Sequence, residues 1–123
     1  MNWRSKKVLV TGAGGFIGSH LCEALLATGA EVTAMLRYSS RCDWGNLEFL
    51  SPEDKSSLKV VAGNIEDSDF VAQQVKGKEV VFHLAALIAI PYSYVAPRSY
   101  VRTNVEGTLN VLEAARNHGV EKI

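Results

Sequence analysis

The sequence predicts an α/β fold in which a doubly wound parallel sheet is covered by helices on both faces. Strand-like apolar runs alternate with segments of helical period along the 123 residues. Runs such as Val8–Val10 and Val80–Phe82 contain no polar residue, which is typical of strands buried on both faces. This alternation implies right-handed crossovers between neighbouring parallel strands. We therefore expect one domain, spanning residues 1–123.

The bulk composition narrows the classes of function. Lysine and arginine together number 13, as do aspartate and glutamate, so no net field favours nucleic acid or an anionic membrane surface. No apolar run reaches the roughly 18 residues that a membrane helix needs, and the polar N-terminus is unlike a signal peptide. We expect a cytoplasmic protein that binds neither nucleic acid nor membrane, with Cys22 and Cys42 as reduced thiols.

The first strand and the first helix flank a glycine-rich turn. The run Val8–Val10 ends at a cluster of four glycines, after which Ile17, Leu21 and Leu25 recur at helical spacing. Gly29 follows at the position where glycine commonly ends a helix. A Gly-x-x-Gly-x-x-Gly spacing indicates dinucleotide binding when it follows a strand and opens a helix, as it does in this predicted order.

The three spaced glycines have separate roles in this prediction. Gly12 permits a tight turn, Gly15 lets the backbone approach a diphosphate, and Gly18 lets the helix pack closely on the strand. The free N–H groups at the helix start form an anion site. A glycine-rich turn without a ligand is the alternative. The context favours dinucleotide binding, with the diphosphate at Gly12, Gly15, Phe16, Ile17 and Gly18.

The remaining elements follow from strand-like runs, helix caps and turn residues. A second strand is expected at Glu31–Leu36, followed by an irregular, ligand-facing segment at 37–52. A third strand is expected at Leu58–Ala62, followed by a helix that Asp67 or Ser68 caps and Gly77 ends. A fourth strand at Glu79–His83 is followed by a loop at Leu84–Ala96. Pro97 then begins a long helix that Gly119 ends, with a predicted buried stripe of Val101, Val105, Thr108, Leu109, Leu112 and Ala115.

Residues Val120–Ile123 indicate the entry to a fifth strand. The predicted strand order is 3-2-1-4, which is the first half of a Rossmann-type dinucleotide-binding fold. We therefore expect this chain to be the N-terminal portion of a longer protein, with the substrate domain absent.

Polar residues after the second strand predict how the adenosine ribose is bound. Arg37 stands where a binder of the unphosphorylated cofactor usually has an acidic residue, and its guanidinium offers a fork to a 2′-phosphate. Ser39 adds a donor nearby. A solvated arginine at a strand end is the alternative. Arg37 and Ser39 therefore favour NADP, with NAD as the second possibility.

Two further segments are expected at the ligand edge of the sheet. After the third strand, the Asn64 amide suits the adenine amino group and Ile65 suits the ring, although Asn64 also fits a simple turn. After the fourth strand, Leu84, Ala85 and Ala86 let the backbone approach a ribose. The aromatic stretch beyond them is interpreted as a substrate rim at Ile88, Tyr92 and Tyr94, with plain packing as the alternative.

The other polar residues are assigned structural roles. His83 is interpreted as a buried histidine at a strand end, because no acidic residue stands beside it in sequence. Asn104 and Thr108 are expected to brace neighbouring strands through side-chain hydrogen bonds. No histidine or cysteine pair has the spacing of metal ligands, so no metal site is predicted.

Together these motifs resemble the extended short-chain dehydrogenase/reductase family, the NAD(P)-dependent epimerases and dehydratases of nucleotide sugars. The matching pieces are Thr11-Gly-x-x-Gly15-x-x-Gly18, Asn64-Ile65, His83-Leu-Ala-Ala86, Asn104-Val-Glu-Gly107-Thr108 and Asn110–Arg116. Within the family, Leu36–Ser40 is similar to NADP-using GDP-mannose 4,6-dehydratases. Pro91–Tyr94 and Trp44–Leu47 are similar to 4,6-dehydratases of UDP- or GDP-N-acetylglucosamine.

The resemblance implies an enzyme that oxidises a UDP- or GDP-hexose at C4, eliminates water from C5–C6 and returns hydride to C6. The family's catalytic Tyr-x-x-x-Lys pair does not occur here, because the residues four positions after Tyr38, Tyr92, Tyr94 and Tyr100 are Cys, Ala, Arg and Asn. No catalytic residue is therefore assigned, and the chain is expected to be inactive. The resemblance also implies a homodimer through the 97–118 helix. A non-catalytic NAD(P)-sensing module of the same fold is the alternative function.

Overall fold

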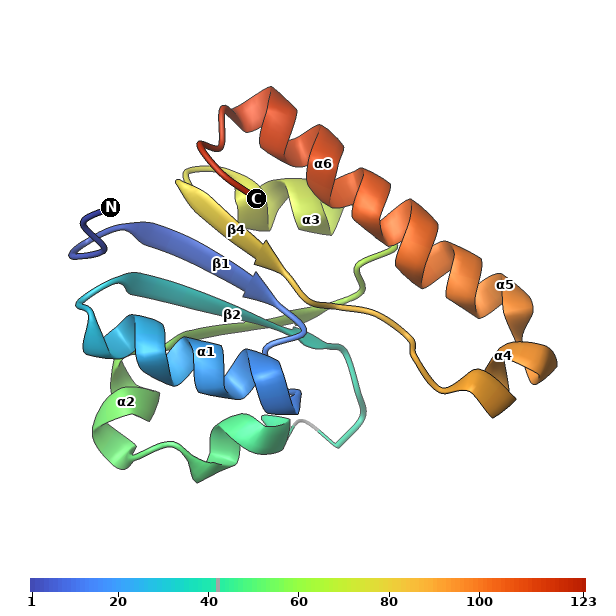
Figure 1. Ribbon diagram of the computed structural model, residues 1–123, viewed down its shortest axis with the longest axis horizontal. Coiled ribbons are helices and arrows are strands. Elements are labelled where there is room, and N and C mark those ends of the chain that lie inside the picture. Colours follow the sequence, from blue (N-terminus) through green and yellow to red (C-terminus); the bar gives the residue numbers. More distant parts are fainter. Residues whose placement is uncertain (42) are drawn as a thin grey trace.

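In the computed structural model, which describes residues 1–41 and 43–123, four strands form a parallel sheet in the order β3-β2-β1-β4. The strands are β1 (Lys7–Thr11), β2 (Glu31–Arg37), β3 (Lys59–Gly63) and β4 (Val80–His83). Figure 1 shows helices on both faces of this sheet. The predicted fold class and strand order are confirmed.

The expected fifth strand is present only as its first contact with β4. The Glu121 N–H donates to the Glu79 carbonyl at 2.9 Å, and the Val81 N–H donates to the Lys122 carbonyl at 3.0 Å. These two bonds form a parallel bridge between Val80 and Lys122. The sheet order therefore continues outward from β4, as the sequence predicts.

The two faces of the sheet are covered by different helices. Helices α1 (Phe16–Ala27) and α2 (Pro52–Ser57), with the 3₁₀ helix η1 (Gly45–Phe49), cover one face, and α3 (Ser68–Val75) and α6 (Gly107–His118) cover the other (Figure 1). Successive residues of β1 alternate between these faces, because side chains point to opposite sides along a strand. Val8 and Val10 pack on the α1 side, whereas Leu9 packs on the α3–α6 side.

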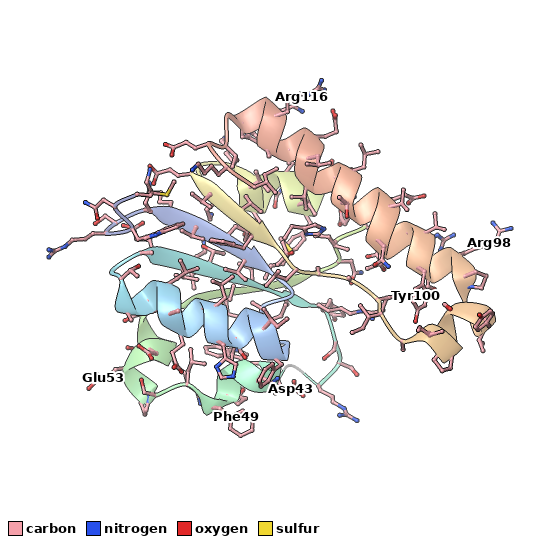
Figure 2. The ribbon with its side chains drawn as sticks, viewed as in Figure 1. Asp43, Phe49, Glu53, Arg98, Tyr100 and Arg116 are labelled. Atoms are coloured by element: carbon pink, nitrogen blue, oxygen red, sulfur yellow. The ribbon has the colours of Figure 1, made fainter. Side chains whose placement is uncertain are left out.

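Two segments expected to be irregular contain helices. The 37–52 segment includes η1 and the first residue of α2, whose start is stabilised by the Ser51 hydroxyl accepting from the Asp54 N–H at 3.1 Å. Leu47 of η1 is buried, while Phe49 projects from the surface (Figure 2). The expected 84–96 loop includes α4 (Ile90–Val95), which has proline in its first turn. Helices η1, α2 and α4 have five or six residues each, which is too short to give a clear helical period in the sequence.

The long helix forms where it was predicted but turns a different face toward the sheet. It runs through α5 (Pro97–Tyr100), the π-helical segment η2 (Val101–Glu106) and α6. Its buried residues are Thr103, Gly107, Val111, Ala114 and Ala115, so only Ala115 of the predicted stripe is buried. The predicted stripe residues Val101, Val105, Leu109 and Leu112 are instead 49–61% exposed.

Close packing against the sheet explains this difference. A Cβ added to Gly107 would lie 2.7 Å from Cγ2 of Ile65, so only a glycine allows the helix to approach this closely. Helix α1 follows the same rule, because Gly18, Cys22 and Leu25 are buried while Ile17 is 70% exposed. Ile17 thus lies outside the core and lines a pocket at the start of α1.

Cys22, in α1, is a free cysteine buried in the core. Burial raises the pKa of the Cys22 thiol to about 12, so this cysteine is protonated near neutral pH. Cys42 lies outside the described residues. No helix within residues 1–41 and 43–123 has the length and apolar character required to cross a membrane.

Candidate dinucleotide-binding site

A pocket of about 530 Å³, here called the edge pocket, lies at the carboxyl ends of the parallel strands. Most of the predicted cofactor residues line it, although they come from four separate parts of the chain. They are Gly12, Gly15, Phe16, Ile17, Gly18, Arg37, Ile65, Leu84, Ala85 and Ala86, with Ile88 of the predicted rim. Ser39, Asn64, Tyr92 and Tyr94 do not line it. Ligands of open α/β sheets bind at this edge.

The glycine turn supplies the floor of the edge pocket. Gly12 has φ +65°, and a Cβ at this position would lie 2.8 Å from the backbone nitrogen of Ala85. A Cβ on Gly18 would lie 2.2 Å from the Gly12 carbonyl oxygen, so α1 packs directly on the turn. At Gly15 the nearest such atom is 3.5 Å away. Gly12 and Gly18 are therefore required by the fold, whereas Gly15 faces the pocket.

The first turn of α1 lies at the edge pocket and has no side-chain cap, whereas the Ser51 hydroxyl caps α2 and the Asp67 carboxylate caps α3. The first N–H groups of a helix need an acceptor, and the helix dipole places positive charge there. An uncapped first turn beside a pocket-facing glycine fits a diphosphate. The exposed side chains of Phe16 and Ile17 form an apolar rim above it.

A second hollow of about 370 Å³ shares Arg37 and Glu66 with the edge pocket. It contains Asn64 and also Arg102, which the sequence analysis did not single out. Glu66 accepts a hydrogen bond from the Thr103 hydroxyl at 2.8 Å. Neither arginine makes an ion pair within the described part of the chain. The hollow is therefore lined by two arginines and by two carboxylates, those of Glu66 and Asp67.

The wall after β4 is braced by the long helix, as predicted. The Leu87 N–H donates to Oδ1 of Asn104 and the Leu87 carbonyl accepts from Nδ2, both at 2.9 Å. Thr108 contacts the ring of His83. His83 is half-buried, and burial lowers its pKa. The imidazole is therefore neutral near pH 7.

The predicted rim residues Tyr92 and Tyr94 are exposed on α4, outside the edge pocket. The Tyr100 hydroxyl donates a hydrogen bond to the Ala89 carbonyl, which ties α5 to the chain entering α4. Among the residues that the structure describes, no group of three or more His, Cys, Asp or Glu side chains could hold a metal ion.

The glycine turn, the uncapped helix start and a pocket at the β1–β4 edge define a Rossmann-type nucleotide-binding domain. A family model described as GDP-mannose 4,6 dehydratase matches residues 9–123. The chain belongs to this family of nucleotide-sugar dehydratases and epimerases. The resemblance read from its motifs is confirmed.

Three similar proteins illustrate the relationship. UDP-glucose 4-epimerase of Mycolicibacterium smegmatis is 41% identical over 119 residues, covering 95% of this chain and 37% of the relative. UDP-N-acetylglucosamine 4-epimerase of Methanobrevibacter ruminantium, solved with UDP-N-acetylmuramic acid, has a TM-score of 0.80 at 34% identity, with 95% and 36% covered. WbmH of Bordetella bronchiseptica, solved with NAD+, has a TM-score of 0.75 at 33% identity, with 95% and 37% covered. The chain thus spans slightly more than a third of the length of each.

The pocket-facing position of Gly15 generates a direct prediction for cofactor binding. Gly15→Val should weaken dinucleotide binding about 10- to 150-fold, because a branched side chain displaces the diphosphate from charge-assisted hydrogen bonds. Isothermal titration with NADP and NAD measures this loss. Thr33→Val, a change at a buried β2 position outside the pocket, is the control and should bind like the parent. Equal affinity of Gly15→Val and the parent would contradict the site.

Proposed function

We propose that this chain is the NAD(P)-binding portion of a nucleotide-sugar 4,6-dehydratase or epimerase. The observation that carries the proposal is the glycine turn and uncapped start of α1 opening into the edge pocket. The bound cofactor supplies the hydride chemistry, and the protein supplies binding and orientation. The proposed overall reaction is oxidation of the sugar at C4, loss of water from C5–C6 and return of hydride to C6.

Nucleotide sugars are the proposed substrates. The relatives from M. smegmatis and M. ruminantium are named for UDP-sugars, and the matching family model is named for a GDP-sugar. These names support a UDP- or GDP-hexose as the substrate class. The exposed segment from Ile88 to Tyr94 borders the edge pocket at Ile88 and is the proposed rim toward the sugar.

NADP is the proposed cofactor. Arg37 lines both the edge pocket and the second hollow, and Arg102 lines the hollow from the long helix. A 2′-phosphate at this position would be near Arg37 and Arg102, each able to form charge-assisted hydrogen bonds, although Glu66 and Asp67 also line the hollow. WbmH was solved with NAD+, so the preference for the phosphorylated cofactor rests on this chain's own arginines.

Substitution of Arg37 tests the proposed preference for NADP over NAD. The parent should bind NADP about 10- to 150-fold more tightly than NAD, which corresponds to a charge-assisted hydrogen bond of about 1.5–3 kcal/mol. Arg37→Asp should reverse the order, because a carboxylate repels the 2′-phosphate and accepts from ribose hydroxyls. Titration of each variant with both cofactors measures the ratio.

Arg98→Asp is the matched control, since Arg98 points away from the molecule on α5 (Figure 2). It should leave the NADP-to-NAD ratio of the parent unchanged. Equal affinity of the parent for the two cofactors would overturn the proposed preference.

The 123 residues are proposed to bind the cofactor without turning over substrate. Oxidation at C4 needs a base for the sugar hydroxyl proton, and general acid–base catalysis contributes roughly 10²–10⁴-fold. None of the four tyrosines is followed by a lysine one helical turn later. The neutral His83 ring already has hydrogen-bond partners on both nitrogens.

The test of this expectation is incubation of the chain with NADP+ and a panel of UDP- and GDP-hexoses. Mass spectrometry should detect no 4-keto-6-deoxy product above the control without protein. Product above that control would show that a residue of this chain serves as the base, with His83 and Tyr94 as the first to replace.

A homodimer through the long helix is proposed from its exposed apolar stripe. Val101, Val105, Leu109 and Leu112 recur at helical spacing on the face turned away from the sheet, where roughly half of each side chain is exposed. Contiguous exposed apolar surface of this kind marks interaction sites. The family resemblance supports a second copy of the chain as the partner.

Charge placed on this stripe tests the dimer. The parent should show a sedimentation coefficient that rises with concentration, whereas Leu109→Glu should remain monomeric, because association would bury an unpaired carboxylate. Asn117→Glu, on an exposed position of the same helix outside the stripe, is the control and should associate like the parent. A concentration-independent monomer in the parent would contradict the proposal.

A further inference from the structure

A chain of side-chain hydrogen bonds joins the ends of β1 and β4 to the long helix. Oγ1 of Thr11, the last residue of β1, lies 2.8 Å from Nδ1 of His83, the last residue of β4. The same oxygen accepts from the backbone N–H groups of Leu84 at 3.0 Å and Ala85 at 3.1 Å. Thr11 therefore has three polar partners around one hydroxyl.

These partners determine where the Thr11 hydroxyl proton lies. A hydroxyl has one hydrogen to donate and two lone pairs to accept. The two backbone N–H groups occupy both lone pairs. Among the described residues, Nδ1 of His83 is the one partner left for the hydroxyl hydrogen, and it has to be unprotonated in order to accept that hydrogen.

The protonation of the other ring nitrogen, Nε2, is determined by Thr108 of the long helix. Nε2 of His83 lies 3.1 Å from Oγ1 of Thr108, and the Thr108 hydroxyl donates to the Asn104 carbonyl at 2.7 Å. Since the Thr108 hydrogen is used on that carbonyl, its oxygen accepts from the ring. Nε2 therefore carries the proton. One tautomer, neutral with hydrogen on Nε2, satisfies every group in the chain.

This network holds the pocket wall formed by residues 84–87, all of which line the edge pocket. At the start of the wall, Leu84 and Ala85 are fixed by Thr11 and lie against the backbone of Gly12. At its end, Leu87 is fixed by both amide atoms of Asn104. Between these anchors Ala86 lines the edge pocket, at the predicted ribose position.

We propose that His83 is a positioning residue for the bound dinucleotide, acting through Thr11 rather than by contact with the ligand. As a neutral imidazole with its proton on Nε2, it accepts the Thr11 hydroxyl hydrogen and leaves both lone pairs of that oxygen for the Leu84 and Ala85 N–H groups. The proposal rests on the proposed function for the identity of the ligand. The hydrogen-bond partners of the two ring nitrogens, Thr11 and Thr108, are uncharged.

The tautomer and the wall are measured without any ligand. In the ¹⁵N-labelled chain at pH 7, the ring nitrogen shifts of His83 should show a neutral imidazole protonated on Nε2. Amide hydrogen exchange at Leu84 and Ala85 should accelerate about five- to tenfold in His83→Phe and in Thr11→Val, as expected for one lost hydrogen bond. Thr11→Ser, which keeps the hydroxyl, should restore slow exchange. Thr33→Val is the control and should leave these amides unchanged.

Cofactor affinity is measured on the same variants with NADP. His83→Phe and Thr11→Val should bind it about five- to tenfold more weakly than the parent, and Thr11→Ser should bind it like the parent. The His83 side chain hydrogen-bonds to neither amide, and Ala85 is not its neighbour in sequence, so faster exchange at Ala85 in His83→Phe reports positioning through Thr11. If His83→Phe does not fold, the pair Thr11→Val and Thr11→Ser decides, because both keep the ring.

A ring protonated on Nδ1, a charged ring at pH 7, or unchanged Leu84 and Ala85 exchange in either Thr11→Val or a folded His83→Phe variant would overturn the proposal. If the parent binds NADP and both Thr11→Val and His83→Phe bind it as tightly as the parent does, the proposal is also overturned. Failure of the parent to bind either NADP or NAD would instead overturn the proposed function and the ligand named here. The tautomer and exchange measurements decide the positioning of the wall on their own.

Discussion

The contact between the backbone of Gly12 and that of Leu84 and Ala85 is the constraint on which the site depends. No side chain fits between them, since a Cβ on Gly12 would lie 2.8 Å from the Ala85 nitrogen. The turn leaving β1 and the wall leaving β4 therefore form one continuous surface. With Gly18 packed on the Gly12 carbonyl, the first turn of α1 is held facing the same space. Small changes at this contact would move the floor and the wall together.

The parallel sheet explains why residues so distant in sequence meet at one edge. All four strands described here point the same way, so the glycine turn, Arg37, Ile65 and Ala85 emerge at the same end. Helices α1, α2 and α3, which follow β1, η1 and β3, differ in how their first turns are capped. Ser51 and Asp67 satisfy the first turns of α2 and α3, whereas the first turn of α1 has no side-chain cap and opens into the edge pocket. The uncapped start of α1 is therefore where the proposed diphosphate would bind.

The long helix serves the pocket with one face and presents apolar surface with another. Its sheet-facing side carries Thr103, Asn104 and Thr108, whose hydrogen bonds reach Glu66, Leu87 and His83. These contacts require close approach, which Gly107 allows. The larger apolar residues are therefore turned outward, where association between chains would bury them. The same packing requirement links pocket geometry to the proposed dimer.

The sequence alone determined the features that depend on local chemistry. The apolar strands, the glycine turn at Gly12, the Asp67 cap, the helix end at Gly119 and the strand order could all be predicted, because each depends on neighbouring residues and general handedness rules. Only the tertiary structure decided which way each helix faces. Leu109 was predicted to be buried, yet it is 55% exposed, because Gly107 on the same helix packs against Ile65 instead. Arg102 lines the same hollow as Arg37 only because the fold brings these two distant positions together. Likewise, the tautomer of His83 depends on Thr11 and Thr108, which are distant in sequence and reach the ring only in the folded chain.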